Sequence, residues 1–268
     1  MTIHLREIQI TTPKDRLDRF PFSVPVVQTL EKVSFPTPVT IFVGENGSGK
    51  STLLEALARS AQMITVGSEE TQRDQTLDAL QPLADHLKLV WNKRTHRGFF
   101  LRAEDFFGYV KRLRALRLEM QADLEQIEKD YWGRSDYAKA LASMPAASSL
   151  HALDAAYGDD LDANSHGESF LALFQSRFVP DGLFILDEPE AALSPVSQLG
   201  LIAMIKEMVP RGGQFIIATH SPILMAMPDA SIFDLDHRPP GFVQYNDLES
   251  VNLYRSFLEN PDSYINRL

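Results

Sequence analysis

Short apolar runs alternate with amphipathic segments along most of this chain. Residues 39–43, 183–188 and 214–219 are almost continuously apolar, which is typical of strands buried on both faces of a sheet. Segments with helical spacing lie between and after these runs. The helices predicted in this way are 50–63, 168–178, 195–209 and 247–260, with a short helix from Pro222 and further strands at 231–236 and 242–246. This alternation predicts an α/β protein with a mostly parallel sheet that helices cover on both faces.

The first part of the chain has a different pattern. Residues 3–10 suit a strand, and the segment that follows contains several prolines, which favours short strands joined by turns. We expect a small N-terminal β-layer beside the glycine-rich stretch 44–51. Residues 87–91 and 98–103 are also strand-like and flank a basic turn, so they predict a β-hairpin.

The longest helical pattern covers residues 105–132. Its apolar side chains recur every three or four residues and form one seam: Leu113, Leu116, Met120, Leu124, Ile127 and Tyr131. Residues 133–164 are rich in Ala, Ser and Asp and are interrupted by Gly133, Pro145 and Gly158, so we expect short helices or a mobile loop there. The sequence therefore predicts a single domain, 1–268, with a helical insertion at 105–164.

The composition is that of a globular protein, with 44% hydrophobic and 23% charged residues. The chain has no cysteine, which excludes disulfides and thiolate metal sites. Its start lacks the layout of a secretion signal, and no apolar run approaches the length needed to span a bilayer. We expect a cytoplasmic protein without a membrane partner.

The net charge of −10 argues against nucleic-acid binding over the general surface. Two local basic clusters remain, at residues 93–97 and 111–117. Acidic residues follow the second cluster at 119–128, and this favours a solvated helix face that is paired with its own carboxylates.

The stretch 40–54 carries the strongest motif. Gly44, Gly49, Lys50 and Ser51 match the pattern of a phosphate-binding loop between a strand and a helix. Glycines let backbone N–H groups point inward at a phosphate, and the helix that follows adds donors and the positive end of its dipole. Lys50 would reach the β- and γ-phosphates, and Ser51 would offer its hydroxyl to Mg²⁺. The alternative is a glycine-rich loop that only resembles this pattern.

Two adjacent carboxylates end the apolar run 183–186. Asp187 would hold Mg²⁺, directly or through water, and Glu188 would orient and deprotonate an attacking water. The alternative is a buried strand that emerges at an acidic turn. The phosphate loop upstream favours the catalytic interpretation.

Residues 164–168, NSHGE, predict a helix start. Ser165 followed three residues later by Glu168 forms a capping box. The same helix end, with the Ser165 hydroxyl and the Gly167 N–H, also suits a γ-phosphate. The two interpretations are compatible.

Residues 219–222, THSP, follow a buried strand. Ser221 as the helix cap and Pro222 as the first helical residue explain half of this motif structurally. His220 is then left at the end of the strand, where it could contact the γ-phosphate or the attacking water. A structural histidine is the alternative.

The order GENGSGKS, SHGE, FILDEPEAALS and THSP resembles the ATP-binding-cassette (ABC) ATPases, and within them the soluble SMC/RecF-like group. The resemblance covers residues 1–236. It implies that ATP and Mg²⁺ are bound by a Walker A loop, and that a signature motif contacts ATP held by the opposite subunit. The implied Walker A residues are Asn46, Gly47, Ser48, Gly49, Lys50, Ser51 and Thr52, and the signature residues are Ser165, His166, Gly167 and Glu168.

The resemblance also implies that 190–194 forms the D-loop and that His220 is the switch histidine. ATP would then lie between two copies of the chain, in a homodimer that closes on ATP and opens after hydrolysis. The chain departs from the family pattern at His166, which replaces a glycine. Glu104 lies where the family has a glutamine, and Phe20 and Phe22 are the candidates for stacking on adenine.

Two kinds of biological role remain open. The resemblance suggests DNA handling or repair, which the basic positions Arg94, Arg97, Lys111 and Arg114 would support. The alternative is an ATP-gated module that regulates a partner protein, as in defence or toxin–antitoxin systems, and the acidic net charge favours it. A transporter subunit is the least favoured role.

Overall fold

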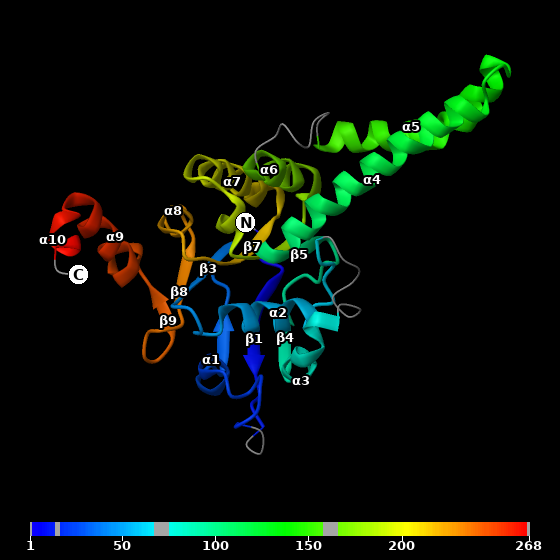
Figure 1. Cartoon of the computed structure of the whole chain (residues 1–268). Coiled ribbons are helices and arrows are strands. Elements are labelled where there is room, and N and C mark those ends of the chain that lie inside the picture. The colour runs from blue at the N-terminus through cyan, green and yellow to red at the C-terminus, as the bar shows by residue number, and fades with distance from the viewer. Residues whose placement is uncertain (1, 14–16, 67–74, 158–165, 267–268) are drawn as a thin grey trace.

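The computed structural model describes residues 2–13, 17–66, 75–157 and 166–266, and within them the strands form two sheets (Figure 1). The larger sheet has the order β5 (Gly98–Arg102), β6 (Leu183–Asp187), β7 (Gln214–Ala218), β3 (Val39–Val43), β8 (Ser231–Asp234) and β9 (Gly241–Val243). The smaller, antiparallel sheet has the order β2 (Lys32–Ser34), β1 (Leu5–Ile10) and β4 (Leu87–Trp91). The second sheet is the N-terminal β-layer that the sequence predicts.

The larger sheet is parallel except for β9, which pairs antiparallel with β8. Successive residues of its strands alternate between two hydrophobic cores. In β3, for example, Ile41 belongs to one core and Phe42 to the other. Both faces of this sheet are therefore buried, and the prediction of a mostly parallel α/β sheet is confirmed.

The helices are divided between the two faces. The core on the face with the N-terminal layer contains residues of α1 (Pro25–Thr29), α2 (Lys50–Ser60) and α3 (Gln81–Asp85). The core on the other face contains residues of α6 (His166–Arg177), α7 (Pro195–Met208), α8 (Pro222–Met225) and α9 (Glu249–Glu259). The remaining short elements are η1 (Gln75–Leu80), η2 (Pro189–Ala192), η3 (Val209–Arg211), η4 (Tyr245–Asp247) and α10 (Asp262–Ile265).

The predicted hairpin of residues 87–91 and 98–103 is wrong. β4 pairs with β1 in the smaller sheet, whereas β5 is a parallel strand beside β6 at the edge of the larger one. The physical reason is the difference in burial pattern. Residues 99–101 of β5 are all buried, as a strand covered on both faces requires, whereas β4 is buried only at Leu87.

Two long helices project from this body as an arm (Figure 1). They are α4 (Ala103–Asp130) and α5 (Asp136–Tyr157), and we call residues 103–157 the arm. Ion pairs join them along their length, between Arg117 and Asp154 at 2.7 Å and between Lys139 and Glu128 at 2.5 Å. None of the described helices is both long and apolar enough to cross a membrane.

The prediction of short helices or a mobile loop at 133–164 is wrong for the described part of that segment. Residues 136–157 form one helix that includes Pro145. Proline costs a helix about 3 kcal/mol in its interior, but the alanine-rich neighbours favour the helix and packing against α4 supports it.

Candidate functional site

The loop between β3 and α2 is curled by its glycines. Gly44, Gly47 and Gly49 have φ values of 152°, 85° and 99°, which side chains other than glycine rarely adopt. At Gly49 an added Cβ would also approach the side chains of Val24 and Val26 to 2.6 Å. The path of the loop therefore favours glycine at these positions, most strongly at Gly49.

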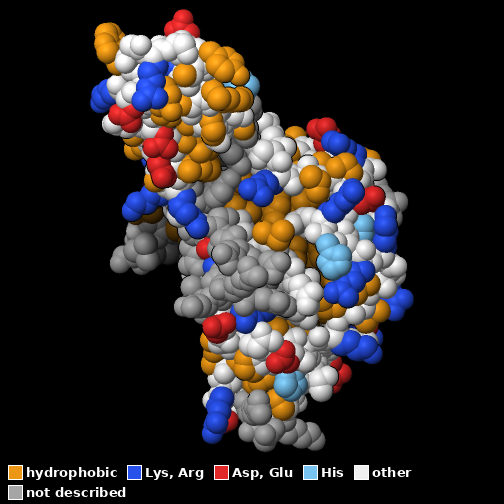
Figure 2. Space-filling view, turned by 90° about the vertical axis from the view of Figure 1, so that its right-hand side faces the viewer, with side chains coloured by type: hydrophobic (Ala, Val, Ile, Leu, Met, Phe, Trp, Pro, Cys, Tyr) orange, Lys and Arg blue, Asp and Glu red, His pale blue; other side chains and the backbone are white. Residues whose placement is uncertain are grey.

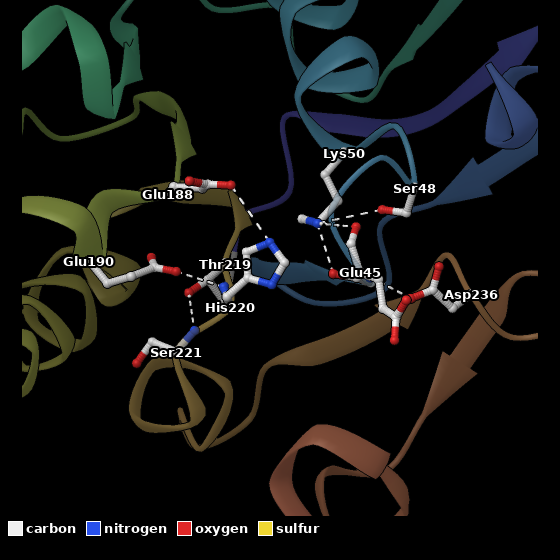
Figure 3. A network of polar contacts seen from close by, with 10 residues as sticks. Glu45, Ser48, Lys50, Glu188, Glu190, Thr219, His220, Ser221 and Asp236 are labelled. Atoms are coloured by element: carbon white, nitrogen blue, oxygen red, sulfur yellow. Dashed lines mark hydrogen bonds and ion pairs between the residues drawn. The ribbon is translucent and has the colours of Figure 1, made fainter. Parts of the chain in front are cut away.

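Lys50, the first residue of α2, folds its side chain back into this loop. Its Nζ donates to the carbonyl oxygens of Gly44 at 2.8 Å and Glu45 at 3.0 Å (Figure 3). The residue is only 4% exposed. Burial lowers the pKa of Lys50, and the carboxylates of the site, with Glu188 first among them, oppose this decrease.

Asp187 ends β6 and is buried. Burial raises the pKa of Asp187 to about 6, with a smaller increase from the charge of Glu188, while a hydrogen bond from Ser51 opposes the increase. The Oδ1 atom of Asp187 is buried without a hydrogen-bond partner. This oxygen atom is therefore expected to bind a ligand that the protein itself does not supply.

This arrangement fits a Mg²⁺ ion. A buried carboxylate oxygen without a donor, beside a serine hydroxyl, offers the hard oxygen ligands that Mg²⁺ prefers. No group of three or more His, Asp or Glu side chains in the described residues could hold a metal by itself. Asp187 and Ser51 would therefore share Mg²⁺ with phosphate oxygens and water, as is usual for this ion.

Glu188 follows Asp187 in the left-handed conformation, with φ 48° and ψ 49°. Its N–H donates to the carbonyl of Ala218 at 2.9 Å, which ties it to the end of β7. The Oε1 of Glu188 lies 3.7 Å from Nε2 of His220 (Figure 3). That separation is too long for a hydrogen bond, so the two side chains face one another without being paired.

The structure thus brings four of the predicted site residues to one edge of the sheet: Lys50, Asp187, Glu188 and His220. The predicted loop residues Asn46, Gly47, Ser48, Gly49, Ser51 and Thr52 form the curl and the first turn of α2. Parallel strands explain this convergence, because β3, β6 and β7 are neighbours and end at the same edge.

The predicted signature residues are only partly described. Ser165 lies outside the described residues, and Gly167 and Glu168 are described only in their backbone, in the first turn of α6. Glu104 is likewise described only in its backbone, in the first turn of α4.

The two candidates for stacking on adenine differ in accessibility. Phe22 is 1% exposed and makes an edge contact with His86, with ring centroids 5.3 Å apart. It lies within the core of the N-terminal layer, so its assignment as an adenine contact is wrong. Phe20 is 57% exposed and remains accessible.

Two further carboxylates belong to the site: Asp236 was not found from the sequence, and Glu190 was predicted only as part of the D-loop. Asp236, just after β8, accepts a hydrogen bond from the N–H of Glu45 at 2.5 Å, and Glu190 accepts one from the N–H of His220 at 2.6 Å (Figure 3). The one available signal for Asp236 was an acid at the end of an apolar run. Together with Asp187 and Glu188, they place four negative charges around Lys50.

Two protein-family models match this chain, and each contains one part of the site. Residues 25–62 match a model described as "AAA domain", and residues 169–226 match one described as "AAA domain, putative AbiEii toxin, Type IV TA system". The first match contains the loop of Lys50, and the second contains Asp187, Glu188 and His220. With the fold described above, these matches support a nucleotide-binding P-loop ATPase that is similar to the ABC and SMC-like ATPases.

Individual proteins show more distant similarity. The chain is 27% identical over 213 residues to the hemin import ATP-binding protein HmuV of Jannaschia sp., covering 76% of this chain and 71% of that protein. It is 26% identical over 200 residues to the cobalt import ATP-binding protein CbiO of Salmonella typhimurium, covering 73% of this chain and 66% of that protein.

Solved structures with similar backbones include both transporter cassettes and SMC heads. One is a nucleotide-free ATP-binding cassette from an ABC transporter, with 16% identity, coverage of 87% of both chains and a TM-score of 0.44. Another is an Smc head bound to the C-winged helix domain of ScpA, with 14% identity, coverage of 90% of this chain and 98% of that one, and a TM-score of 0.46.

Proposed function

We propose that this ATPase binds Mg·ATP in the loop 44–52 and hydrolyses it with Glu188 as the general base. The observation that carries the proposal is the buried Asp187 carboxylate, which accepts from Ser51 and is followed directly by Glu188 at the open end of β6. Asp187 and Ser51 would hold Mg²⁺, which neutralises charge on the phosphates when bound.

Hydrolysis would then use groups that lie together in this structure. The oxygen of a water molecule attacks the γ-phosphorus, the bond from that phosphorus to the bridging oxygen breaks, and Glu188 takes the proton of the water. Lys50 and His220 stabilise the charge on the γ-phosphate oxygens. ADP and phosphate are the products.

Glu188→Gln tests this assignment. The variant keeps the size and the hydrogen-bonding capacity of the side chain but cannot accept the proton. It should bind Mg·ATP with wild-type affinity and hydrolyse it at least about a hundredfold more slowly, since general bases contribute factors of this order. Wild-type turnover would remove Glu188 from the role of base.

We further propose that the chain forms a homodimer with two ATP molecules between its copies. The segments 165–168 and 190–194 occur in the sequence order of the ABC type, in which they complete the site of the opposite copy. Sedimentation of the Glu188→Gln variant with and without Mg·ATP tests this, and a monomer at saturating Mg·ATP would contradict it.

DNA handling is the first candidate for the work that hydrolysis drives. It depends on the basic residues at 93–97 and at the root of the arm. Some of these already have acidic partners: Lys93 lies 3.5 Å from Asp181, and Arg117 lies 2.7 Å from Asp154. Arg94, Arg97 and Lys111 are exposed and could contact a phosphate backbone.

Regulation of a partner protein is the second candidate, and the surface of the arm favours it. Figure 2 shows hydrophobic side chains gathered on the arm. Those near its end include Trp132 at 87%, Tyr137 at 79%, Leu141 at 56% and Met144 at 55% exposure. Apolar groups gathered in this way are typical of protein–protein contacts. The "putative AbiEii toxin" description of the matched model also supports this candidate.

One measurement separates the two candidates. DNA handling requires that duplex DNA stimulates ATP turnover at low salt, and that added salt removes the stimulation steeply because counterions are released on binding. Turnover that does not respond to DNA at low salt would favour the protein partner. The similarity to import ATP-binding proteins leaves a transporter subunit as a third and less favoured role.

A further inference from the structure

Two loops meet beside the site, 188–194 after β6 and 219–221 after β7. A carboxylate joins them directly: Oε1 of Glu190 accepts a hydrogen bond from the backbone N–H of His220 at 2.6 Å (Figure 3). Hydrogen bonds from N–H groups to carboxylates are about twice as strong as those between neutral groups. The peptide unit that carries His220 is therefore fixed by a residue of the neighbouring loop.

A second link runs parallel to the first. The side chain of Gln198 accepts from the hydroxyl of Ser221 at 2.5 Å and donates to the carbonyl of Leu193 at 3.1 Å. The next N–H, that of Ser221, donates to Oγ1 of Thr219 at 2.9 Å. Both peptide units around His220 thus have fixed partners.

The imidazole of His220 itself is not held in this way. Its Nε2 is buried and has no hydrogen-bond partner, and Oε1 of Glu188 lies 3.7 Å from it. The place of the ring beside Glu188 consequently depends on the position of the backbone that carries it.

We propose that Glu190 is a positioning residue for ATP hydrolysis, which holds the main chain of His220 so that the imidazole faces Glu188 and the γ-phosphate. This inference rests on the proposed role of His220. Glu190 does not touch the reacting atoms. It acts through the single N–H that its Oε1 accepts.

The other oxygen of Glu190 distinguishes this role from ordinary loop packing. Oε2 is buried and has no hydrogen-bond partner. Leaving a buried polar atom unpaired costs about 1–3 kcal/mol, so an apolar or smaller side chain would serve packing better. A costly carboxylate at this position is explained if its hydrogen bond to His220 is needed for function.

The test compares Glu190→Ala, which removes the acceptor, with Glu190→Gln, which retains an acceptor oxygen without the charge. We expect Glu190→Ala to lower kcat about tenfold or more and to change the affinity for Mg·ATP less than about twofold, because only the reacting geometry is disturbed. Glu190→Gln should stay within about threefold of the wild type. Glu207→Ala, which changes an exposed glutamate of α7, is the matched control and should behave as the wild type.

Backbone hydrogen exchange at His220, compared with the amides of β7 in the same variant, separates a local change from general unfolding. In the wild type this amide should exchange slowly, and in Glu190→Ala its protection should be lost. Unchanged kcat in Glu190→Ala, an equal loss in Glu190→Gln, a parallel loss of Mg·ATP affinity, or rapid exchange in the wild type would each overturn the inference. Measuring Glu188→Gln in the same assay separates failure of the proposed function from failure of this inference. If Glu188→Gln remains active, the proposed function is contradicted. If Glu188→Gln is inactive but Glu190→Ala remains active, only the role of Glu190 is contradicted.

Discussion

The guanidinium of Arg102, at the end of β5, lies 3.6 Å from the carboxylate of Glu55 in α2. Arg102 also forms two hydrogen bonds with Asp105 in the first turn of α4, at 2.7 Å and 2.9 Å. It is 6% exposed. A buried arginine thus joins the root of the arm to the helix that begins at the phosphate loop.

The first prediction concerns this junction. Arg102→Ala should destabilise the protein by about 3 kcal/mol, because it removes a buried guanidinium that pairs with the largely buried carboxylates of Asp105 and Glu55. Urea unfolding measures the change. Arg97→Ala, which removes an exposed arginine from the turn before β5, should change stability by less than about 0.5 kcal/mol. Equal effects of the two substitutions would contradict the prediction.

The second prediction concerns the close approach of β5 to β6. Gly98 has a φ of 114°, and an added Cβ would lie 1.7 Å from the carbonyl oxygen of Leu183. The strands would have to separate, so Gly98→Ala should cost at least about 3 kcal/mol. Gly108→Ala, in α4, is the control because an added Cβ meets nothing within 4 Å there. A Gly98→Ala protein with the melting temperature of the wild type would refute this account of the strand pair.

The third prediction follows from the pKa of Asp187, which burial raises to about 6. Since this value lies above the ordinary value of 3.8, the folded state favours the protonated carboxyl. The stabilisation that protonation provides is complete below about pH 4 and is lost as the pH rises through about 6. In the absence of nucleotide, Asp187→Asn should therefore be more stable than the wild type at pH 8, by up to about 3 kcal/mol, and the difference should shrink toward pH 4.

Thermal unfolding across this pH range measures the difference, and a constant offset between the two proteins would contradict the assigned cause. The same variant should lose stabilisation by Mg·ATP, because a neutral amide is a poor Mg²⁺ ligand beside the phosphates. If Asp187→Asn is more stable at high pH but is no longer stabilised by Mg·ATP, the Asp187 carboxylate lowers the stability of the free protein and serves to bind Mg²⁺.

The fourth prediction concerns Lys50. At an ATP concentration about a hundred times its dissociation constant, Mg·ATP should stabilise the wild type by about 2.7 kcal/mol, which corresponds to an increase in melting temperature of about 5–10 °C. Lys50→Ala should lose most of this increase, because it removes the buried ammonium that lies against the loop. Lys88→Ala, on the exposed face of β4, should retain it. A full increase in Lys50→Ala would show that nucleotide binds elsewhere.

Much of the fold and the central part of the site could be predicted from the sequence because the relevant signals are local. The apolar runs of β3, β6 and β7, and the glycines before Lys50, can be recognised within a few residues of sequence. Parallel pairing then brings the ends of these strands to one edge, and Lys50, Asp187, Glu188 and His220 come together without any further information.

The remainder depended on contacts between distant parts of the chain. Asp236 accepts from Glu45 across 191 positions, and no local pattern indicates that pairing. The hairpin prediction was wrong because β4 and β5, although neighbours in the sequence, belong to different sheets. β5 lies in the larger sheet because it is buried on both faces. The prediction for 136–157 was wrong because Pro145 signals a break locally, whereas packing on α4 supports an uninterrupted helix.

The length of α4 has a mechanical consequence. Its 28 residues span about 42 Å, and its root contacts both Glu55, through Arg102, and η2, which carries Glu190. A rotation of about 5° at the root would displace the far end by about 4 Å over that length. A force applied near Trp132 would therefore act on the junction with α2 and η2 through a long moment arm, so that a small rotation at the root corresponds to a large displacement at the tip.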